Sequence, residues 1–166
     1  MQIHSLSSRA EAEACAGMMV VSDPWKTLGG TFERCLGIIE QPRQEVYVAD
    51  DGGPAGFIIV NMNGAFVGYI RIICVAPERR SSGLGTQLIR FAEERIFRDS
   101  PNAFLCVSSF NPRARALYER LGYEAVGELR DYLIRGASEI LMRKTKGSIA
   151  EFESGLTSTL PAPSAP

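Results

Sequence analysis

One stretch of the chain, residues 69–91 (YIRIICVAPERRSSGLGTQLIRF), constrains the fold most strongly, because it runs from a strand through glycines directly into a helix. Its first half is apolar and β-branched, which predicts a buried strand, and Pro77 ends that strand because proline cannot donate to a sheet ladder. Gly83 and Gly85 allow the backbone of the following basic turn to approach a ligand, and the helix N-terminus presents unpaired N–H groups there. The stretch therefore predicts an anion site, most often one for phosphate; the alternative is that the glycines only make a tight turn.

The segments around this stretch predict an α/β (α+β) fold with a mixed, mostly antiparallel sheet. Ser8 and Glu11 have the spacing of a helix capping box, Asp23-Pro24-Trp25 breaks the first helix, and Asn63-Gly64 predicts a hairpin connection. A strand–helix–strand crossover places the strands before and after the long helix side by side and parallel. We expect strands near 2–6, 45–49, 55–62, 69–76, 103–108, 123–128 and 138–143, and helices near 8–19, 31–40, 84–97 and 111–122.

Length and composition bound the function. The 166 residues predict one domain over 1–146, followed by a flexible, proline-rich tail over 147–166 that folding and ligand binding do not need. A net charge of −1 argues against a protein that coats nucleic acid, and no apolar run is long enough to predict a membrane span or a signal peptide. The chain has four cysteines without a CxxC pair and one histidine, which argues against zinc or another bound metal and favours reduced thiols in the cytoplasm.

A second motif lies at residues 110–123 (FNPRARALYERLGY), where Asn111 is placed to cap a helix, Pro112 to begin it and Gly122 to end it. The pattern Asn111-x-x-Ala114-x-x-Leu117-Tyr118-x-x-x-Gly122-Tyr123, together with Arg80-x-x-Gly83-x-Gly85 after a strand ending in VAP, resembles the signatures of the GNAT superfamily of acetyl-CoA-dependent N-acetyltransferases. The order of elements also fits, so the resemblance covers about residues 45–144.

This resemblance implies a sheet of about six or seven strands, flanked by about four helices and splayed between the fourth and fifth strands. It implies acetyl-CoA as co-substrate, with the pantetheine arm in the gap. The residues expected to bind it are Ile73, Cys74 and Val75 through their backbone, Arg80, Ser81, Ser82, Gly83, Leu84, Gly85 and Thr86 around the pyrophosphate, and Asn111 and Tyr118 beside the arm. Tyr118 resembles the tyrosine that protonates the leaving thiolate; without the motif it would be taken as a core aromatic.

The final segment, RDYLIRGASEILMRK, is similar to the end of the ribosomal-protein alanine N-acetyltransferases of the RimI type. Their strand glutamate falls at residues 105–107, where this chain has Leu, Cys and Val. General base work then passes to a water, to Tyr132, or to Glu128 or Asp131.

The predicted reaction is direct attack of a primary amine on the thioester, for which positioning supplies much of the acceleration. The acceptor is either a small-molecule amine or the amine of a peptide or protein, and Trp25 and Tyr132 are candidates to contact it, with packing as the alternative for Trp25. An acyl-cysteine route through Cys74 or Cys106 is the less favoured chemistry, because neither has a visible histidine partner. A non-catalytic acyl-CoA-binding module is the alternative function, and a homodimer is left open.

Overall fold

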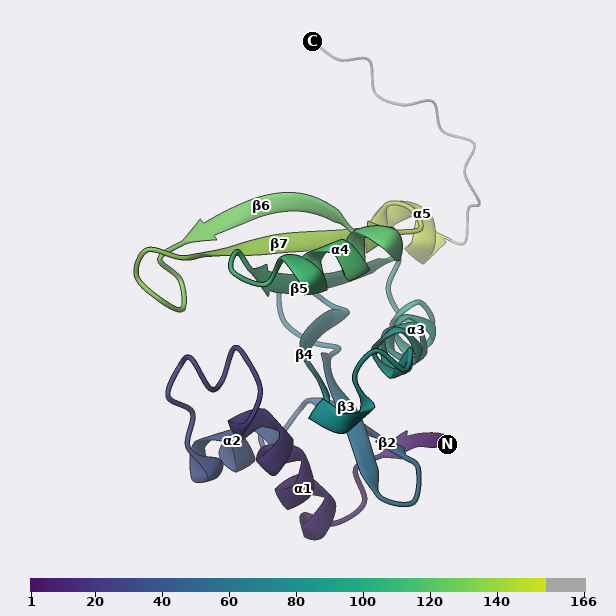
Figure 1. The fold of residues 1–166 in the computed structure, drawn as a ribbon. Coiled ribbons are helices and arrows are strands. Elements are labelled where there is room, and N and C mark those ends of the chain that lie inside the picture. Colours follow the sequence, from purple (N-terminus) through teal and green to yellow (C-terminus); the bar gives the residue numbers. More distant parts are fainter. Residues whose placement is uncertain (155–166) are drawn as a thin grey trace.

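A mixed sheet with the order β1-β2-β3-β4-β5-β7-β6 organises the computed structural model, which describes residues 1–154 (Figure 1). The strands are β1 (Gln2–Ser5), β2 (Glu45–Asp50), β3 (Pro54–Asn61), β4 (Tyr69–Val75), β5 (Asn102–Ser108), β6 (Glu124–Arg130) and β7 (Ser138–Thr145). The helices are α1 (Arg9–Val20), α2 (Phe32–Ile39), α3 (Leu84–Ile96), α4 (Pro112–Arg120) and α5 (Ile149–Ser154), with the 3₁₀ turn η1 (Pro77–Arg79) before α3. Every neighbouring pair of strands is antiparallel except β4–β5. The predicted fold class is therefore confirmed.

Side-chain caps begin three of the helices where the sequence predicts them. Ser8 Oγ accepts the backbone N–H of Glu11, and Asn111 Oδ1 accepts that of Ala114. Thr31 caps α2 in the same way through Arg34 N–H. In the predicted capping box the Glu11 carboxylate accepts the backbone N–H and hydroxyl of Ser7 instead of returning to Ser8. These local bonds satisfy N–H groups that an uncapped helix would leave open.

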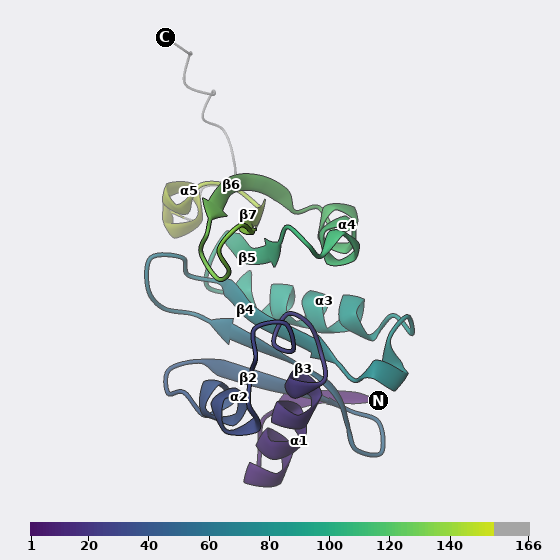
Figure 2. The ribbon, with the colours of Figure 1, turned by 60° about the vertical axis from the view of Figure 1, so that its left-hand side comes forward.

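The sheet splays between β4 and β5, as predicted. These two strands pair only at Tyr69↔Phe104 and Ile70↔Leu105. The separation begins at a bulge, because Val60 of β3 lies opposite Ile70 while the preceding Ile59 lies opposite Ile72, which leaves Arg71 as the extra residue. A bulge bends its strand and increases the local twist. Beyond Arg71 the edge of β4 therefore leaves β5, and Figure 2 shows the two strands diverging.

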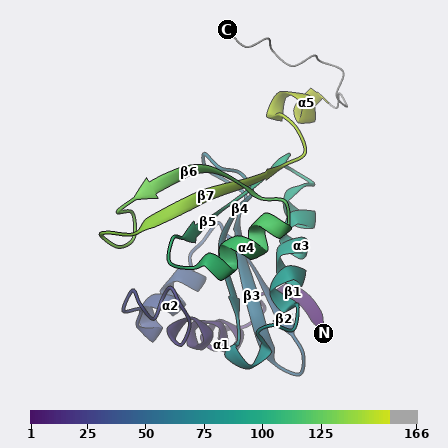
Figure 3. The same cartoon turned by 45° about the horizontal axis from the view of Figure 1, so that its top comes forward.

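Apolar side chains form one core on each face of the sheet. On one face, side chains of α3 and α4, among them Tyr118, pack with Leu105 and Val107. On the other face, side chains of α1 and α2 pack with Phe57 and Ile72. In Figure 3, α1 and α2 lie on one side of β3 and β4 and α3 lies on the other. Because successive strand side chains point to opposite faces, Cys106 and Ser108 of β5 point to the side of α1 and α2.

The connection from β3 to β4 is longer than the two-residue turn that Asn63-Gly64 favours, and it spans residues 62–68. Gly68 N–H donates to Asn61 O at 3.0 Å and closes this loop, while Gly68 O accepts the N–H of Phe104 at 2.9 Å. Gly68 therefore ties the loop to the one place where β4 and β5 still pair.

The first part of the predicted tail is helical, because α5 covers residues 149–154. Residues 155–166 lie outside the described part of the chain, so a flexible, dispensable tail and the domain limit at 146 stay predictions.

An ion pair joins β7 to helix α3. Lys144 of β7 donates to Glu93 of α3 at 2.7 Å, and Glu93 is only 7% exposed. Replacing Lys144 with methionine leaves that buried carboxylate without its cation, so we expect the free energy of unfolding to fall by about 1–3 kcal/mol. Urea denaturation measures the loss. As a control, Arg115→Met breaks the exposed pair with Glu119 and should cost at most about 0.5 kcal/mol. Equal losses in the two variants would contradict a linking role for Lys144.

Candidate active site

One cleft of about 920 Å³ crosses the gap between β4 and β5. It runs from the α1–α2 connection, across both strands, to the glycine turn and the first turns of α4. The predicted site residues that line it are Trp25, Ile73, Cys74, Val75, Arg80, Ser81, Gly83, Gly85, Thr86, Asn111, Tyr118 and Tyr132. Two predicted residues stand apart from it: Ser82 turns its hydroxyl to Arg79 O at 2.6 Å, and Leu84 is buried in the core under α3.

The glycine turn presents backbone N–H groups to the cleft. Gly83 is the N-cap of α3 with φ 87°, and no side chain caps this helix. A Cβ on Gly83 would meet no described atom within 4 Å, so the space beside the turn is open to a ligand. Uncapped N–H groups and the positive end of the helix dipole together favour an anion at this position.

Two arginines hold this turn in place. The guanidinium of Arg80 donates to Ser22 Oγ at 2.6 Å and to Val75 O at 3.3 Å, which ties the turn to the α1–α2 connection. Arg113, in the first turn of α4, donates to Ser81 Oγ at 2.8 Å from the other side of the gap. Sequence reasoning missed Arg113, although its position two residues after Asn111 was a signal. It adds a cation beside the N-terminus of α3.

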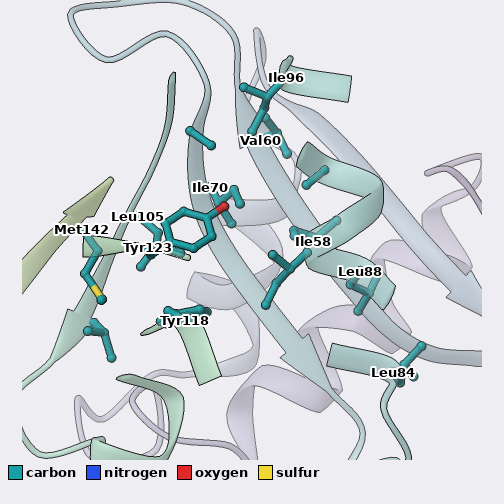
Figure 4. Packing of buried hydrophobic residues seen from close by; sticks show 14 of the residues in the cluster. Ile58, Val60, Ile70, Leu84, Leu88, Ile96, Leu105, Tyr118, Tyr123 and Met142 are labelled. Atoms are coloured by element: carbon teal, nitrogen blue, oxygen red, sulfur yellow. The ribbon is translucent and has the colours of Figure 1, made fainter. Parts of the chain in front are cut away.

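Tyr118 of α4 is 7% exposed and lines the cleft. Burial raises the pKa of its hydroxyl to about 12, so the phenol keeps its proton at neutral pH. Within residues 1–154 this hydroxyl makes no hydrogen bond, and the ring packs edge-on against Tyr123 with centroids 6.1 Å apart. Figure 4 shows both tyrosines among Leu105, Met142 and Ile58. The arrangement leaves a protonated donor at the cleft wall.

The two cysteines at the gap do not form a nucleophilic centre. Cys74 and Cys106 both line the cleft, but burial raises the pKa of Cys74 to about 11 and also raises the pKa of Cys106. The chain's one histidine, His4, lies on β1 and pairs with Glu11. Thiols that remain protonated are poor nucleophiles. This geometry favours direct attack over an acyl-cysteine route.

The acceptor end of the cleft carries both predicted aromatics and a carboxylate that sequence reasoning missed. Trp25 packs in part against the core under α1 and α2, and Tyr132 is 66% exposed on the β6–β7 loop. Glu139 of β7 also lines the cleft and is 6% exposed. The search for a carboxylate on β5 overlooked it because it comes from the adjacent strand, opposite Ser108. The register that pairs β5 with β7 cannot be seen in the sequence.

The other two carboxylates considered as bases lie away from the cleft. Glu128 accepts the hydroxyl of Ser138 at 2.6 Å, and Asp131 accepts the N–H of Gly136 at 2.6 Å inside its own loop. Neither lines the cleft.

Within residues 1–154, no group of three or more histidine, cysteine or acidic side chains is placed to hold a metal ion. In the same range no helix combines the length and apolar character of a membrane span.

Comparison with known proteins assigns the family. The sequence model described as "Acetyltransferase (GNAT) family" matches residues 11–123. The N-alpha-acetyltransferase RimI of Mycobacterium tuberculosis is 30% identical over 149 residues, which cover 84% of this chain and 90% of that protein. An aminoglycoside 6'-N-acetyltransferase complexed with coenzyme A superposes with a TM-score of 0.72 at 19% identity, covering 87% of this chain and 97% of that one. Mutant forms of a spermidine/spermine N-acetyltransferase from Vibrio cholerae superpose with a TM-score of 0.68 at 18% identity, covering 93% of this chain and 98% of that one.

The family match spans most of the described chain, and the RimI relative aligns along nearly its full length. The fold, with its splayed mixed sheet, is the one that the solved acetyltransferases share. The predicted transferase class and co-substrate are confirmed with it. The chain belongs to the GNAT family of acetyltransferases, which move an acetyl group from acetyl-CoA to an amine.

Proposed function

We propose that the cleft holds acetyl-CoA along the edge of β4 and that a primary amine attacks its thioester in the gap between β4 and β5. The observation that carries this proposal is the continuity of one cleft, which joins the uncapped N-terminus of α3 to the acceptor end across the gap. The pantetheine arm carries the thioester into the gap from one face of the sheet, and the amine approaches it from the other.

The cofactor contacts follow from backbone groups that no side chain caps within residues 1–154. The N–H groups at Gly83, Gly85 and Thr86 take the pyrophosphate, with the cation of Arg113 beside them. Ser82 and Leu84 contribute through backbone alone, because their side chains turn away from the cleft. Arg80 acts in the same way, since its guanidinium already binds Ser22 and Val75.

The pantetheine arm takes the open edge of β4. Ile73, Cys74 and Val75 lie beyond the bulge, where β4 no longer pairs with β5, so backbone groups on that edge are available to the arm's amides. Asn111 uses its carbonyl oxygen to cap α4, which leaves its NH₂ group for the arm. Tyr118 donates its proton to the departing CoA thiolate, a role that suits a phenol kept protonated by burial.

The acceptor is a primary amine placed between Trp25 and Tyr132. The related proteins act, by their names, on N-alpha amines, aminoglycosides and spermidine. Release of free thiol from acetyl-CoA, measured with peptides of free N-terminus, polyamines and aminoglycosides, tests the function and selects the class. The same peptides with blocked N-termini are the control. A protein that binds acetyl-CoA and turns over none of them would be the non-catalytic module.

We also propose a cytoplasmic location, which rests on four cysteines that are all free. A homodimer stays a prediction.

Replacing Gly83 with valine is expected to lower acetyl-CoA affinity at least tenfold, about 1.4 kcal/mol. The new side chain would occupy the open space where the backbone meets the pyrophosphate. Gly64→Val is the matched control, because Gly64 has nearly the same positive φ (86° against 87°) and equally open surroundings but lies outside the cleft. Calorimetry on both variants separates ligand exclusion from backbone strain. Equal affinities in the two would overturn the placement of the pyrophosphate.

A further inference from the structure

We propose that Glu139 is the general base of the reaction: its carboxylate takes a proton from the acceptor amine before that amine attacks the thioester. The inference rests on the proposed direct attack in the β4–β5 gap. It assigns to β7 the carboxylate that the RimI-type glutamate position lacks on β5, where this chain has Leu105, Cys106 and Val107.

Glu139 is fixed at one oxygen and free at the other. Ser108 of β5 donates its hydroxyl to Oε1 at 2.5 Å, and the two residues lie directly opposite one another in the β5–β7 ladder. Within residues 1–154 no hydrogen bond or ion pair engages Oε2, and the side chain lines the cleft. A carboxylate held in this way has its second oxygen available to accept a proton from a ligand.

The surroundings of Glu139 raise the pKa of its carboxyl above the ordinary value. Burial raises the pKa of its carboxyl, partly offset by the Ser108 hydroxyl. Two neighbouring titratable groups are Cys106 of β5 and Tyr69 of β4; burial, and with it the charge of Glu139, raises the pKa of each, so both are neutral at neutral pH. Arg71 of β4 also lines the cleft, and its guanidinium donates to the side-chain oxygens of Gln41 and Gln44. A base whose pKa lies closer to the working pH is the more effective catalyst.

Base and acid then stand on opposite faces of the sheet. Tyr118 belongs to the core under α3 and α4, together with Leu105 and Val107 of β5. Ser108 and its partner Glu139 alternate with that set and point to the face of α1 and α2, where Trp25 lies. An amine that enters from the Trp25 side meets Glu139 first, while the thiolate leaves toward Tyr118. The proton acceptor therefore lies on the face from which the amine enters, and the proton donor lies on the face toward which the thiolate leaves.

Glu128 is excluded from this role by the same alternation. It lies opposite Ile140, the residue after Glu139, so its side chain is on the other face, bound to Ser138.

The proton balance is closed. The acceptor ammonium gives one proton to Glu139, which passes it to solvent, and the neutral nitrogen forms the C–N bond as the C–S bond breaks. The thiolate takes a proton from Tyr118, and the second proton lost by the nitrogen restores the Tyr118 hydroxyl through solvent. Overall, an ammonium and acetyl-CoA give an acetamide, free CoA thiol and one proton.

The test is Glu139→Gln, with Glu128→Gln as the matched control. We expect kcat/KM for the best amine of the thiol-release panel to fall by about 10²–10⁴-fold in Glu139→Gln, with acetyl-CoA affinity unchanged within about twofold. The deficit should shrink as pH rises, because solvent then deprotonates the amine. Glu128→Gln should match the parent. In Glu139→Ala, added formate or acetate should restore part of the rate, which a merely structural role would not allow.

A second variant keeps the inference testable if Glu139 substitutions do not fold. Ser108→Ala removes the hydrogen bond that lowers the pKa of Glu139, so the acidic limb of the pH–kcat/KM profile should move to higher pH. Turnover of Glu139→Gln within twofold of an active parent, or an unmoved acidic limb in Ser108→Ala, would overturn the base assignment and leave the acetyltransferase function standing. A parent that turns over no amine would instead overturn the proposed function, and this inference with it.

Discussion

Replacement of Tyr118 by phenylalanine is expected to lower kcat by about 10²–10⁴-fold, the contribution of a positioned general acid. The ring and its packing among Leu105, Met142 and Tyr123 are retained, so stability and acetyl-CoA affinity should change little. Only the proton that burial holds on the phenol is lost. Steady-state turnover and calorimetric affinity, measured on the same preparation, check the two halves of this expectation.

The chain supplies a matched control in Tyr123→Phe. Tyr123 is also buried, burial and the nearby Glu93 raise the pKa of its hydroxyl, and it does not line the cleft. The Tyr123→Phe variant should have the same kcat as the parent. If Tyr118→Phe also stays within a factor of two of the parent, Tyr118 is only packing and the thiolate is protonated by water or another side chain.

Replacing Gly68 with valine is expected to lower the free energy of unfolding by about 3 kcal/mol or more. Gly68 has φ 87°, which strains a β-branched residue by about 1–3 kcal/mol. Its Cβ would also stand 2.4 Å from Asn102 O and 2.5 Å from Ile96 Cγ2, and such overpacking costs about 1–3 kcal/mol more. Asn102 begins β5, so relief of the clash must move the one place where β4 and β5 pair.

Urea denaturation of Gly68→Val beside Gly64→Val isolates the clash from the strain. The two glycines share a positive φ in the same loop, but a Cβ on Gly64 meets no described atom within 4 Å. Gly68→Val should therefore be the less stable variant by about 1–3 kcal/mol. Equal midpoints would show that the contact with Asn102 is relieved without cost.

Local signals in the sequence were sufficient for most of the fold. The caps at Ser8 and Asn111 and the strand that ends before Pro77 each depend on neighbours a few residues away, and the structure forms them as expected. The length of the 62–68 loop was less predictable, because Asn102 and Ile96, from distant parts of the chain, leave no room for a side chain at residue 68. Tertiary contacts decided that turn, and no dipeptide rule contains them.

The candidate site was predictable as far as its motifs reach. The turn at Gly83 and the helix carrying Tyr118 line one cleft, and both came from residue spacing together with the family resemblance. Glu139 and the bulge at Arg71 escaped prediction because both depend on strand register, which pairs residues far apart in the chain. Leu84 illustrates the reverse case: it belongs to the motif, but the helix turns its side chain into the core.

The splay at β4–β5 gives this sheet two edges in its interior as well as two at its rim. An unpaired edge is ordinarily a place where a foreign strand can add. Here helices cover the faces on either side of the gap, so what enters must be thin and must carry amides of its own. A pantetheine arm satisfies both conditions and would act as a transient, non-peptide strand. In each turnover, binding of the co-substrate would therefore also fill the gap in the sheet between β4 and β5.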